Sequence, residues 1–322
     1  MKNSIAASEL KAVGIKPKSR RRRDLKKTIE LTILALPALC LIILFHYVAM
    51  PGIILAFKNY NFRAGIFGSP WSGLENFKFV FSTPASLIAL RNTVLYNLLF
   101  IVIGNVGTIT LAVLMNELRS KTALKVYQTA IFLPHFLSWT VVAFIVYALL
   151  NHSYGAINSI LTSLGANKIE WYNSPQYWPV ILTYSSFWKG FGYGTLLKYA
   201  YILAIDPTYY EAAAIDGASR WQIATRITIP CISPIIIIGL LGSLGNIFNA
   251  DFGLFYLVPM NSSLINRVTS VMDTYVYSAL IGSADIGMGA AAGLFQSVAG
   301  FVLVILSNKL IAKHVGRQSA MY

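Results

Sequence analysis

Long apolar runs alternate with short polar segments along most of this chain. Crossing the hydrocarbon core of a bilayer as a helix takes about 20 mainly apolar residues. The pattern therefore predicts six transmembrane helices and an all-α membrane protein. The first run is too long for a signal-peptide core, and no cleavage pattern follows it. The predicted spans are residues 30–57, 92–115, 124–150, 178–204, 230–250 and 285–310.

The amino-acid composition supports this class. Of the 322 residues, 56% are hydrophobic and 12% are charged, whereas soluble domains have about 25% charged residues. The two cysteines, Cys40 and Cys231, lie far apart in or beside apolar runs. Because neither has the spacing of a metal ligand, both are interpreted as small hydrophobic residues, and no metal site is predicted.

The charge distribution predicts how the chain is oriented. Lys and Arg number 26 against 12 Asp and Glu, a net charge of +14, and ten of the cations lie in the first 27 residues. A nucleic-acid-binding protein would spread its cations over a soluble surface, so this class is excluded. With the basic segment in the cytosol, the predicted inner segments hold 18 Lys and Arg and the outer loops hold 6. This bias follows the positive-inside rule, and an even number of spans places both termini in the cytosol.

A polar segment between the fourth and fifth spans predicts a helix-turn-helix on the cytosolic side. Asp206 and Pro207 suit the cap and first position of a helix that continues through TYYEAAAID. Gly217 is the residue best suited to a left-handed helix stop. Ser219 and Gln222 then form a capping-box pattern for a second helix, which ends near Pro230.

The first of these two helices has a small, smooth side-chain surface. Three consecutive alanines, Ala212 to Ala214, would let another protein approach the backbone closely, and Glu211 and Asp216 place a charge at each end. These features predict a rigid projection that docks in a groove of a partner. A hairpin that only joins two spans is the alternative. A DNA-binding helix-turn-helix is excluded, because membrane spans flank the segment and it has only two arginines for phosphates.

The segment EAAAIDGASRWQIATRITIP resembles the EAA loop of permease subunits in binding-protein-dependent ATP-binding-cassette (ABC) importers. That pattern has Glu-Ala-Ala, a Gly four residues later, then nine residues and Ile-x-Leu-Pro. Glu211, Gly217, Ile227 and Pro230 match it, and Ile229 is a conservative departure from Leu. The resemblance extends to carbohydrate-importer permeases, including those of bacterial alginate importers. It is carried by WSGLENFKFVF (71–81), RNT (91–93), FLPHFLSWTVVAFI (132–145) and FWKGFGYGTLLKYAYILAIDPTYYEAAAIDGA (187–218).

The resemblance implies a type I ABC importer permease in a bacterial cytoplasmic (inner) membrane. The first hairpin helix would then be the coupling helix that docks in one of two separate ATPase subunits, which use ATP and Mg. A second permease would complete the pathway, and carbohydrate importers often use two different ones. An extracytoplasmic solute-binding protein would deliver an oligosaccharide or polysaccharide. The implied coupling residues are Glu211, Ala212, Ala213, Ala214, Asp216 and Gly217.

Polar residues within predicted spans are candidates for a substrate path, because they are costly in lipid and usually face the bundle interior or water. Lys189 ranks first: a cation favours an anionic sugar such as alginate, and the neighbouring aromatic faces suit sugar rings. Lys198 ranks lower, because it lies nearer the cytosol and can snorkel. The alternative for each residue is that its polar group only hydrogen-bonds to another of these residues where the helices pack together. The predicted path residues are Lys189, Trp188, Tyr193, Asn246, Asn249, Asp251 and Gln296.

Two other functional classes remain as alternatives. An ATP-independent secondary transporter or channel would need an ion-coupling site, and the spans show few ionisable residues and no inverted repeat. A membrane enzyme would need a catalytic constellation, and none has useful spacing. No phosphate-binding G-x-x-x-x-G-K-[ST] loop occurs, so ATP hydrolysis and every cofactor are assigned to partners. The predicted organisation is a basic tail (1–28), a permease domain (29–311) with its coupling loop at 206–230, and a C-terminal tail (312–322).

Overall fold

The computed structural model describes residues 20–48, 50–283 and 285–314. It divides into two compact units, residues 1–54 and 55–322, which are described separately. The described chain is helical, and its β-structure is limited to one isolated antiparallel bridge between Lys58 and Trp71. Most of the predicted N-terminal tail (residues 1–19) and of the predicted C-terminal tail (315–322) lies outside the described residues.

The first unit contains the first predicted span. Its main helix begins at Arg20, within the predicted tail 1–28, because Arg and Lys are good helix formers and do not end a helix. Lys27–Phe57 is long and apolar enough to cross a membrane, in agreement with the predicted span 30–57. The elements are α2 (Arg20–Ile42), the π-helical η1 (Ile43–Tyr47) and most of the 3-10 helix η2 (Met50–Phe57).

The second unit contains all other described helices. Its first part consists of α3 (Gly65–Gly68), α4 (Glu75–Ser82), α5 (Pro84–Asn116), α6 (Lys121–Phe132), η3 (Leu133–Phe136), α7 (Trp139–Leu150) and α8 (Ala156–Ser163). The middle part consists of η4 (Trp171–Asn173), η5 (Pro175–Tyr177), α9 (Trp178–Leu203), α10 (Pro207–Ile215), α11 (Arg220–Ile223), η6 (Ala224–Thr228), α12 (Ile229–Cys231) and α13 (Ser233–Gly245). The last part consists of η7 (Gly253–Leu257), η8 (Ser263–Ile265), α14 (Asn266–Thr269), α15 (Met272–Ser283) and α16 (Ile286–His314).

Between three and five spans of the described residues are long and apolar enough to cross a membrane. Besides Lys27–Phe57 these are Pro84–Asn116 and Ile286–Lys309, together with two bent pairs. The pairs are Lys121–Phe136 with Trp139–Leu150, bent by 99°, and Arg220–Cys231 with Ser233–Gly245, bent by 60°. The remaining predicted span, 178–204, coincides with α9, a 26-residue helix whose lysines and small polar residues lower its mean hydropathy. A total of six spans therefore stays a prediction.

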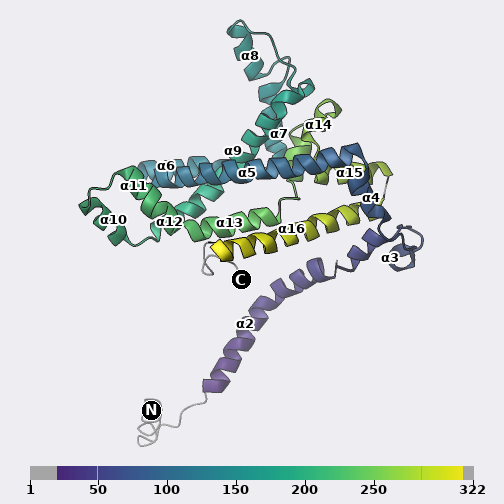
Figure 1. The fold of residues 1–322 in the computed structure, drawn as a ribbon, viewed down its shortest axis with the longest axis horizontal. Helices are drawn as coiled ribbons and strands as arrows, with labels where there is room; N and C mark the ends of the chain where they lie inside the picture. Colours follow the sequence, from purple (N-terminus) through teal and green to yellow (C-terminus); the bar gives the residue numbers. More distant parts are fainter. Residues whose placement is uncertain (1–19, 49, 284, 315–322) are drawn as a thin grey trace, which may run out of the picture. The chain divides into compact units, whose positions relative to one another are not determined.

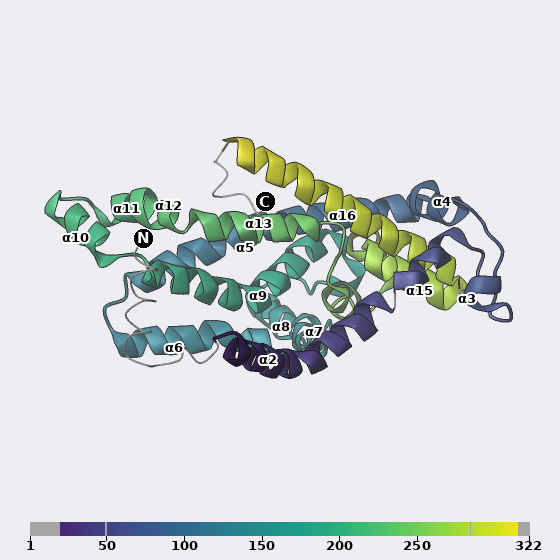
Figure 2. The ribbon, with the colours of Figure 1, turned by 90° about the horizontal axis from the view of Figure 1, so that it is seen from below.

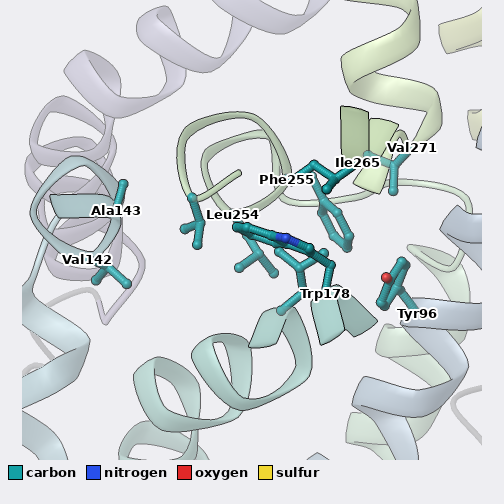
Figure 3. Packing of buried hydrophobic residues seen from close by; sticks show 10 residues of the cluster. Tyr96, Val142, Ala143, Trp178, Leu254, Phe255, Ile265 and Val271 are labelled. Carbon is teal, nitrogen blue, oxygen red and sulfur yellow. The ribbon is translucent and has the colours of Figure 1, made fainter. Parts of the chain in front are cut away.

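The largest group of buried side chains joins α5, α7 and α9 to the segment 254–271 (Figure 3). Trp178, at the start of α9, is fully buried, and its Nε1 donates a hydrogen bond to the carbonyl of Trp171 at 2.8 Å. On the other side of this core, Tyr96 of α5 packs edge-on against Phe255, with ring centroids 5.0 Å apart. This packing fixes the three helices relative to one another at one end of α9.

Helices α5 and α9 form the most extensive helix pair of the second unit. The hairpin helices α10 and α11 lie at one end of α5, and α4 and α15 lie at its other end (Figures 1 and 2). The predicted orientation places the first end in the cytosol and the second outside. Both ends of α5 therefore carry polar connecting segments, as a membrane-spanning helix requires.

Candidate functional site

Residues 206–231, called the hairpin below, begin with a capped helix. The Oδ1 atom of Asp206 accepts hydrogen bonds from the backbone N–H of Thr208 at 3.0 Å and from its hydroxyl at 2.8 Å. Both bonds favour the ionised carboxylate and hold the pKa of Asp206 below its usual value. Pro207 occupies the first helical position, where its missing N–H needs no partner.

The first hairpin helix ends at Gly217, as the sequence predicts. Gly217 has a φ of +70°, its N–H donates to the carbonyl of Ala214 at 3.2 Å, and the N–H of Ala218 donates to that of Ala213 at 2.9 Å. These two bonds form a Schellman motif, which glycine enters without strain. A Cβ at Gly217 would meet no other atom within 4 Å. Glycine is therefore required here by the backbone conformation and not by lack of space.

The second hairpin helix is capped and anchored. The N–H of Ser219 donates to Oε1 of Gln222 at 2.7 Å, and the N–H of Gln222 donates to Oγ of Ser219 at 3.3 Å, which completes the predicted capping box. Nη1 of Arg220 lies 3.1 Å from Oε2 of Glu117, the residue that ends α5. The hairpin is thus a preformed element held to the end of α5.

The hairpin surface differs from the predicted alanine face. Ala213 is buried and packs inward, so its side chain is not on the exposed surface. Sequence reasoning missed two large apolar side chains, Ile215 and Trp221, which are 86% and 77% exposed. Apolar groups exposed on a polar element often mark a contact with another protein. The exposed members of the predicted coupling set are Glu211, Ala212, Ala214, Asp216 and Gly217.

A cavity of about 570 Å³ lies between α5, α9 and the C-terminal half of α13. It extends from Thr183 to Lys198 on α9, about 22 Å along the helix axis. A cavity of this size falls in the range of small-molecule sites. Its lining residues are Asn97, Phe100, Ile101, Ile103, Gly104, Asn105, Thr108, Thr183, Ser186, Phe187, Gly190, Phe191, Gly194, Lys198, Gly239, Gly242, Ser243, Asn246 and Asn249.

The asparagine side chains of this cavity present hydrogen-bond acceptors. Nδ2 of Asn97 donates to the backbone carbonyls of Ile247 at 2.8 Å and of Asn249 at 2.9 Å, and Nδ2 of Asn246 donates to that of Gly242 at 3.1 Å. No hydrogen bond of the described residues engages the Oδ1 atoms of Asn97 and Asn246. Because each such oxygen has two lone pairs, this part of the wall can accept hydrogen bonds from the hydroxyl groups of a ligand.

Aromatic and glycine residues form other parts of the cavity wall. The rings of Phe187 and Phe191 stack with centroids 5.1 Å apart and an interplanar angle of 19°. A Cβ at Gly190, Gly239 or Gly242 would meet nothing within 4 Å. The absence of side chains at these glycines therefore contributes directly to the open volume.

Lys198 supplies the charge of the cavity. Its Nζ donates to Oγ1 of Thr108 at 2.7 Å, and that hydroxyl donates in turn to the carbonyl of Gly104 at 2.6 Å. Among the described residues that line the cavity, Lys198 alone is charged. The ion pairs found in the described part of the chain, Lys78–Glu75 and Arg220–Glu117, do not involve it.

The structure places the predicted path residues in four different environments, three of which hold four of the seven residues. Asn246 and Asn249 line the cavity. Trp188 packs against the core of Figure 3 and lines a separate apolar pocket beside α7. Gln296 is buried in α16, where its Nε2 donates to the carbonyl of Phe248 at 2.6 Å and to Oδ2 of Asp273 at 3.3 Å.

The other three predicted path residues gather around Trp139 and His135, outside the residues that line the cavity. Nζ of Lys189 lies 5.1 Å from the Trp139 ring centroid and donates to the carbonyl of His135 at 3.4 Å. Nε1 of Trp139 donates to Oδ2 of Asp251 at 2.6 Å, and Tyr193 stacks on His135 with centroids 5.3 Å apart. The single path predicted from the sequence is therefore divided among four separate environments in the structure.

Helix geometry explains why the two lysines of α9 separate. Lys189 and Lys198 are nine residues apart, which turns the helix by about 180° beyond two full turns. Only one of them can therefore face the cavity. Phe187, Phe191 and Gly194 are 11, 7 and 4 residues before Lys198 and lie on its face, a helical periodicity that is already present in the sequence.

No group of three or more His, Cys, Asp and Glu side chains suited to a metal ion occurs among the residues searched, which are the described ones. The cavity wall offers hydrogen bonding, aromatic stacking and one cation. Such a wall can bind and pass a polar solute.

Comparisons with known proteins agree with this architecture. Residues 104–317 match the family described as "Binding-protein-dependent transport system inner membrane component". The polygalacturonan/rhamnogalacturonan transport system permease protein YteP of Bacillus subtilis (strain 168) is 34% identical over 317 residues, which are 97% of this chain and 98% of YteP. Protein LplB of the same organism is 34% identical over 289 residues, 90% of each chain.

Among solved structures, the chain is similar to one from the crystal structure of a bacterial ABC transporter involved in the import of the acidic polysaccharide alginate. The TM-score is 0.81 at 32% sequence identity, and the match covers 92% of this chain and 99% of that chain. Sequence and structure thus give the same assignment over nearly the whole length. The chain belongs to the family of binding-protein-dependent transport system inner membrane components, the permease subunits of ABC importers.

Proposed function

We propose that this chain forms half of the translocation pathway of an ATP-driven importer for acidic oligosaccharides or polysaccharides. It hydrolyses no ATP and binds no cofactor or metal. Two ATPase subunits supply Mg-dependent ATP hydrolysis, a second permease of different sequence completes the pathway, and a solute-binding protein delivers the sugar. The chain spans the bacterial inner membrane several times with both termini in the cytosol.

One observation carries this proposal: the hairpin is a capped, preformed element that exposes two large apolar side chains, Ile215 and Trp221. An element that transmits a movement must keep its shape under load, and the Schellman motif and capping box provide this. The exposed Ile215 and Trp221 suit burial in a groove of an ATPase subunit. Closure of the two ATPases would then move α9 and α13, the two helices that the hairpin connects along the chain.

The substrate class is taken from the relatives and the cavity together. YteP is described as a permease for polygalacturonan and rhamnogalacturonan, and the matched solved structure belongs to an importer of alginate. Both descriptions name acidic polysaccharides. The cavity of this chain has free amide acceptors, stacked phenylalanines and one cation, a combination that suits hydroxyls, sugar rings and carboxylates.

The coupling role is tested with Gly217→Val in the complete complex in lipid vesicles. Valine strongly resists a φ of +70°, a conformation that costs an L-residue about 1–2 kcal/mol, so the helix stop is displaced. We expect sugar uptake per ATP hydrolysed to fall at least about 10-fold while the chain still inserts. Gly165→Val is the matched control, because Gly165 has a φ of +80°, ends α8 and has open space at its Cβ.

Wild-type coupling in Gly217→Val would contradict the role of the hairpin. An equal loss in Gly165→Val would show that strained glycine stops damage the fold in general. Uptake by this chain in vesicles without any ATPase subunit would favour the alternative, a secondary transporter or channel.

A further inference from the structure

The cavity contains a charged group for which no ion pair is found. Lys198 has three N–H donors, and the one hydrogen bond found for its Nζ is that to Thr108. An ammonium in a partly buried, water-accessible wall is expected to attract an anion. Lys198 is therefore available to a ligand in a way that Lys189 is not, since Lys189 already lies over an indole ring on the opposite face of α9.

Position along the cavity separates the two kinds of polar group. Asn97 and Asn246 lie toward the outer part of the cavity, and Lys198 lies toward the hairpin end of α9. A neutral sugar would satisfy the acceptors, but it offers the ammonium only uncharged hydroxyl and ring oxygens. A uronate residue satisfies both, because it has hydroxyl donors and a carboxylate, and hydrogen bonds between ions are about twice as strong as neutral ones.

We propose that Lys198 determines the specificity of the pathway by binding the carboxylate of an anionic sugar residue as it passes through the cavity between α5, α9 and α13. This inference rests on the proposed function and adds to it the residue that distinguishes acidic from neutral sugars. It also reverses the order of the two lysines that the sequence alone favours. Lys189 acts as a packing residue at the Trp139 and His135 cluster.

A purely structural role is the competing explanation. The bond from Lys198 to Thr108 joins α9 to α5, so a variant could loosen the helix pair without any effect on specificity. Thr108→Val separates the two roles, because it removes the bond, keeps the ammonium and nearly conserves side-chain volume. Lys198→Arg keeps the charge in a different shape, and Lys198→Gln removes it.

The experiment uses the complete complex with its binding protein in lipid vesicles and two probes of equal length, trigalacturonate and its trimethyl ester. For each variant, the uptake of trigalacturonate is divided by the uptake of its trimethyl ester. This ratio is then divided by the wild-type ratio, so that the selectivity of the binding protein cancels. We expect this ratio to fall about 10-fold or more in Lys198→Gln, because an ion-assisted hydrogen bond is lost. It should stay within about 2-fold in Lys198→Arg, Thr108→Val and Lys189→Gln.

An unchanged ratio in Lys198→Gln overturns the inference, as does an equal fall in Thr108→Val or Lys189→Gln. Equal wild-type uptake of both probes also overturns it, while leaving ATP-driven sugar import intact. ATP-independent uptake of the probes, or no uptake of either probe by the wild-type complex, contradicts the proposed function itself. The two failures are therefore distinguishable.

Discussion

The hairpin and the cavity satisfy their polar groups in opposite ways. In the hairpin, the caps at Asp206, Gly217 and Ser219 use backbone and side-chain polar groups internally, while Ile215 and Trp221 are exposed. In the cavity, polar and aromatic side chains share the wall, and several polar atoms keep unused hydrogen-bonding capacity. The first arrangement gives a stiff body that another protein can move. The second leaves polar atoms of the wall available to hydrogen-bond with a polar solute.

The largest effect is expected on sugar uptake, from a substitution in the cavity wall. Gly190→Leu adds an isobutyl group where a Cβ meets open space in the cavity wall. We expect uptake of both acidic and neutral sugars to fall by about 100-fold, because a leucine side chain obstructs the path for any solute. ATPase subunits should still co-purify with the complex, since the hairpin is untouched.

The control for Gly190→Leu is Gly282→Leu in α15. Gly282 is helical, has open space at its Cβ and is absent from the cavity lining. Normal uptake in Gly190→Leu would show that this cavity is not the path. A comparable loss in Gly282→Leu would assign the effect to added bulk in general.

The next prediction concerns the apolar surface of the hairpin. Ile215→Glu places a charge where a side chain is 86% exposed in this chain and buried in the proposed complex. Desolvating an unpaired carboxylate at an interface disfavours binding, and hot-spot residues contribute about 2 kcal/mol or more. We expect ATPase association to weaken by about 30-fold, measured by co-purification at graded concentrations.

Leu164→Glu is the matched control for this change, because Leu164 follows α8 and is 76% exposed. Its substitution should leave ATPase association unchanged. If Ile215→Glu binds the ATPase like wild type, the apolar surface of the hairpin is not the contact.

The two regions also differ in how far the sequence predicts them. The conformation of the hairpin depends on residues that are neighbours in the chain. The sequence therefore predicts correctly the end of the first helix at Gly217 and the capping box of the second helix at Ser219 and Gln222. The burial of Ala213 was not predictable in this way, because it depends on what lies beneath α10. Local rules report backbone conformation, and they do not report which face of a short helix is covered.

The cavity is assembled from helices far apart in the chain, and there the sequence gives only partial guidance. The spacings of seven and four residues between Asn97, Gly104 and Thr108 place all three on one face of α5, and the sequence alone contains this signal. Polarity and mid-span position favoured Lys189, whereas helical phase relative to Phe191 and Gly194 favours Lys198. Which face of each helix lines the cavity is determined by how α5 packs against α9, and the periodicity of the sequence does not specify this packing.

The smallest expected effect tests how firmly the hairpin is held to the rest of the molecule. Glu117→Gln removes the ion pair between Arg220 and the end of α5, whose side chains are 67% and 34% exposed. Exposed ion pairs contribute about 0–1 kcal/mol and are screened by salt. We expect uptake per ATP to fall less than about 2-fold at low ionic strength and to equal wild type at about 0.5 M salt, because the capping box and Schellman motif still fix the hairpin. A loss as large as that expected for Gly217→Val would instead show that movement passes to α5 through this single contact, and the internal caps would then not be what makes the hairpin rigid.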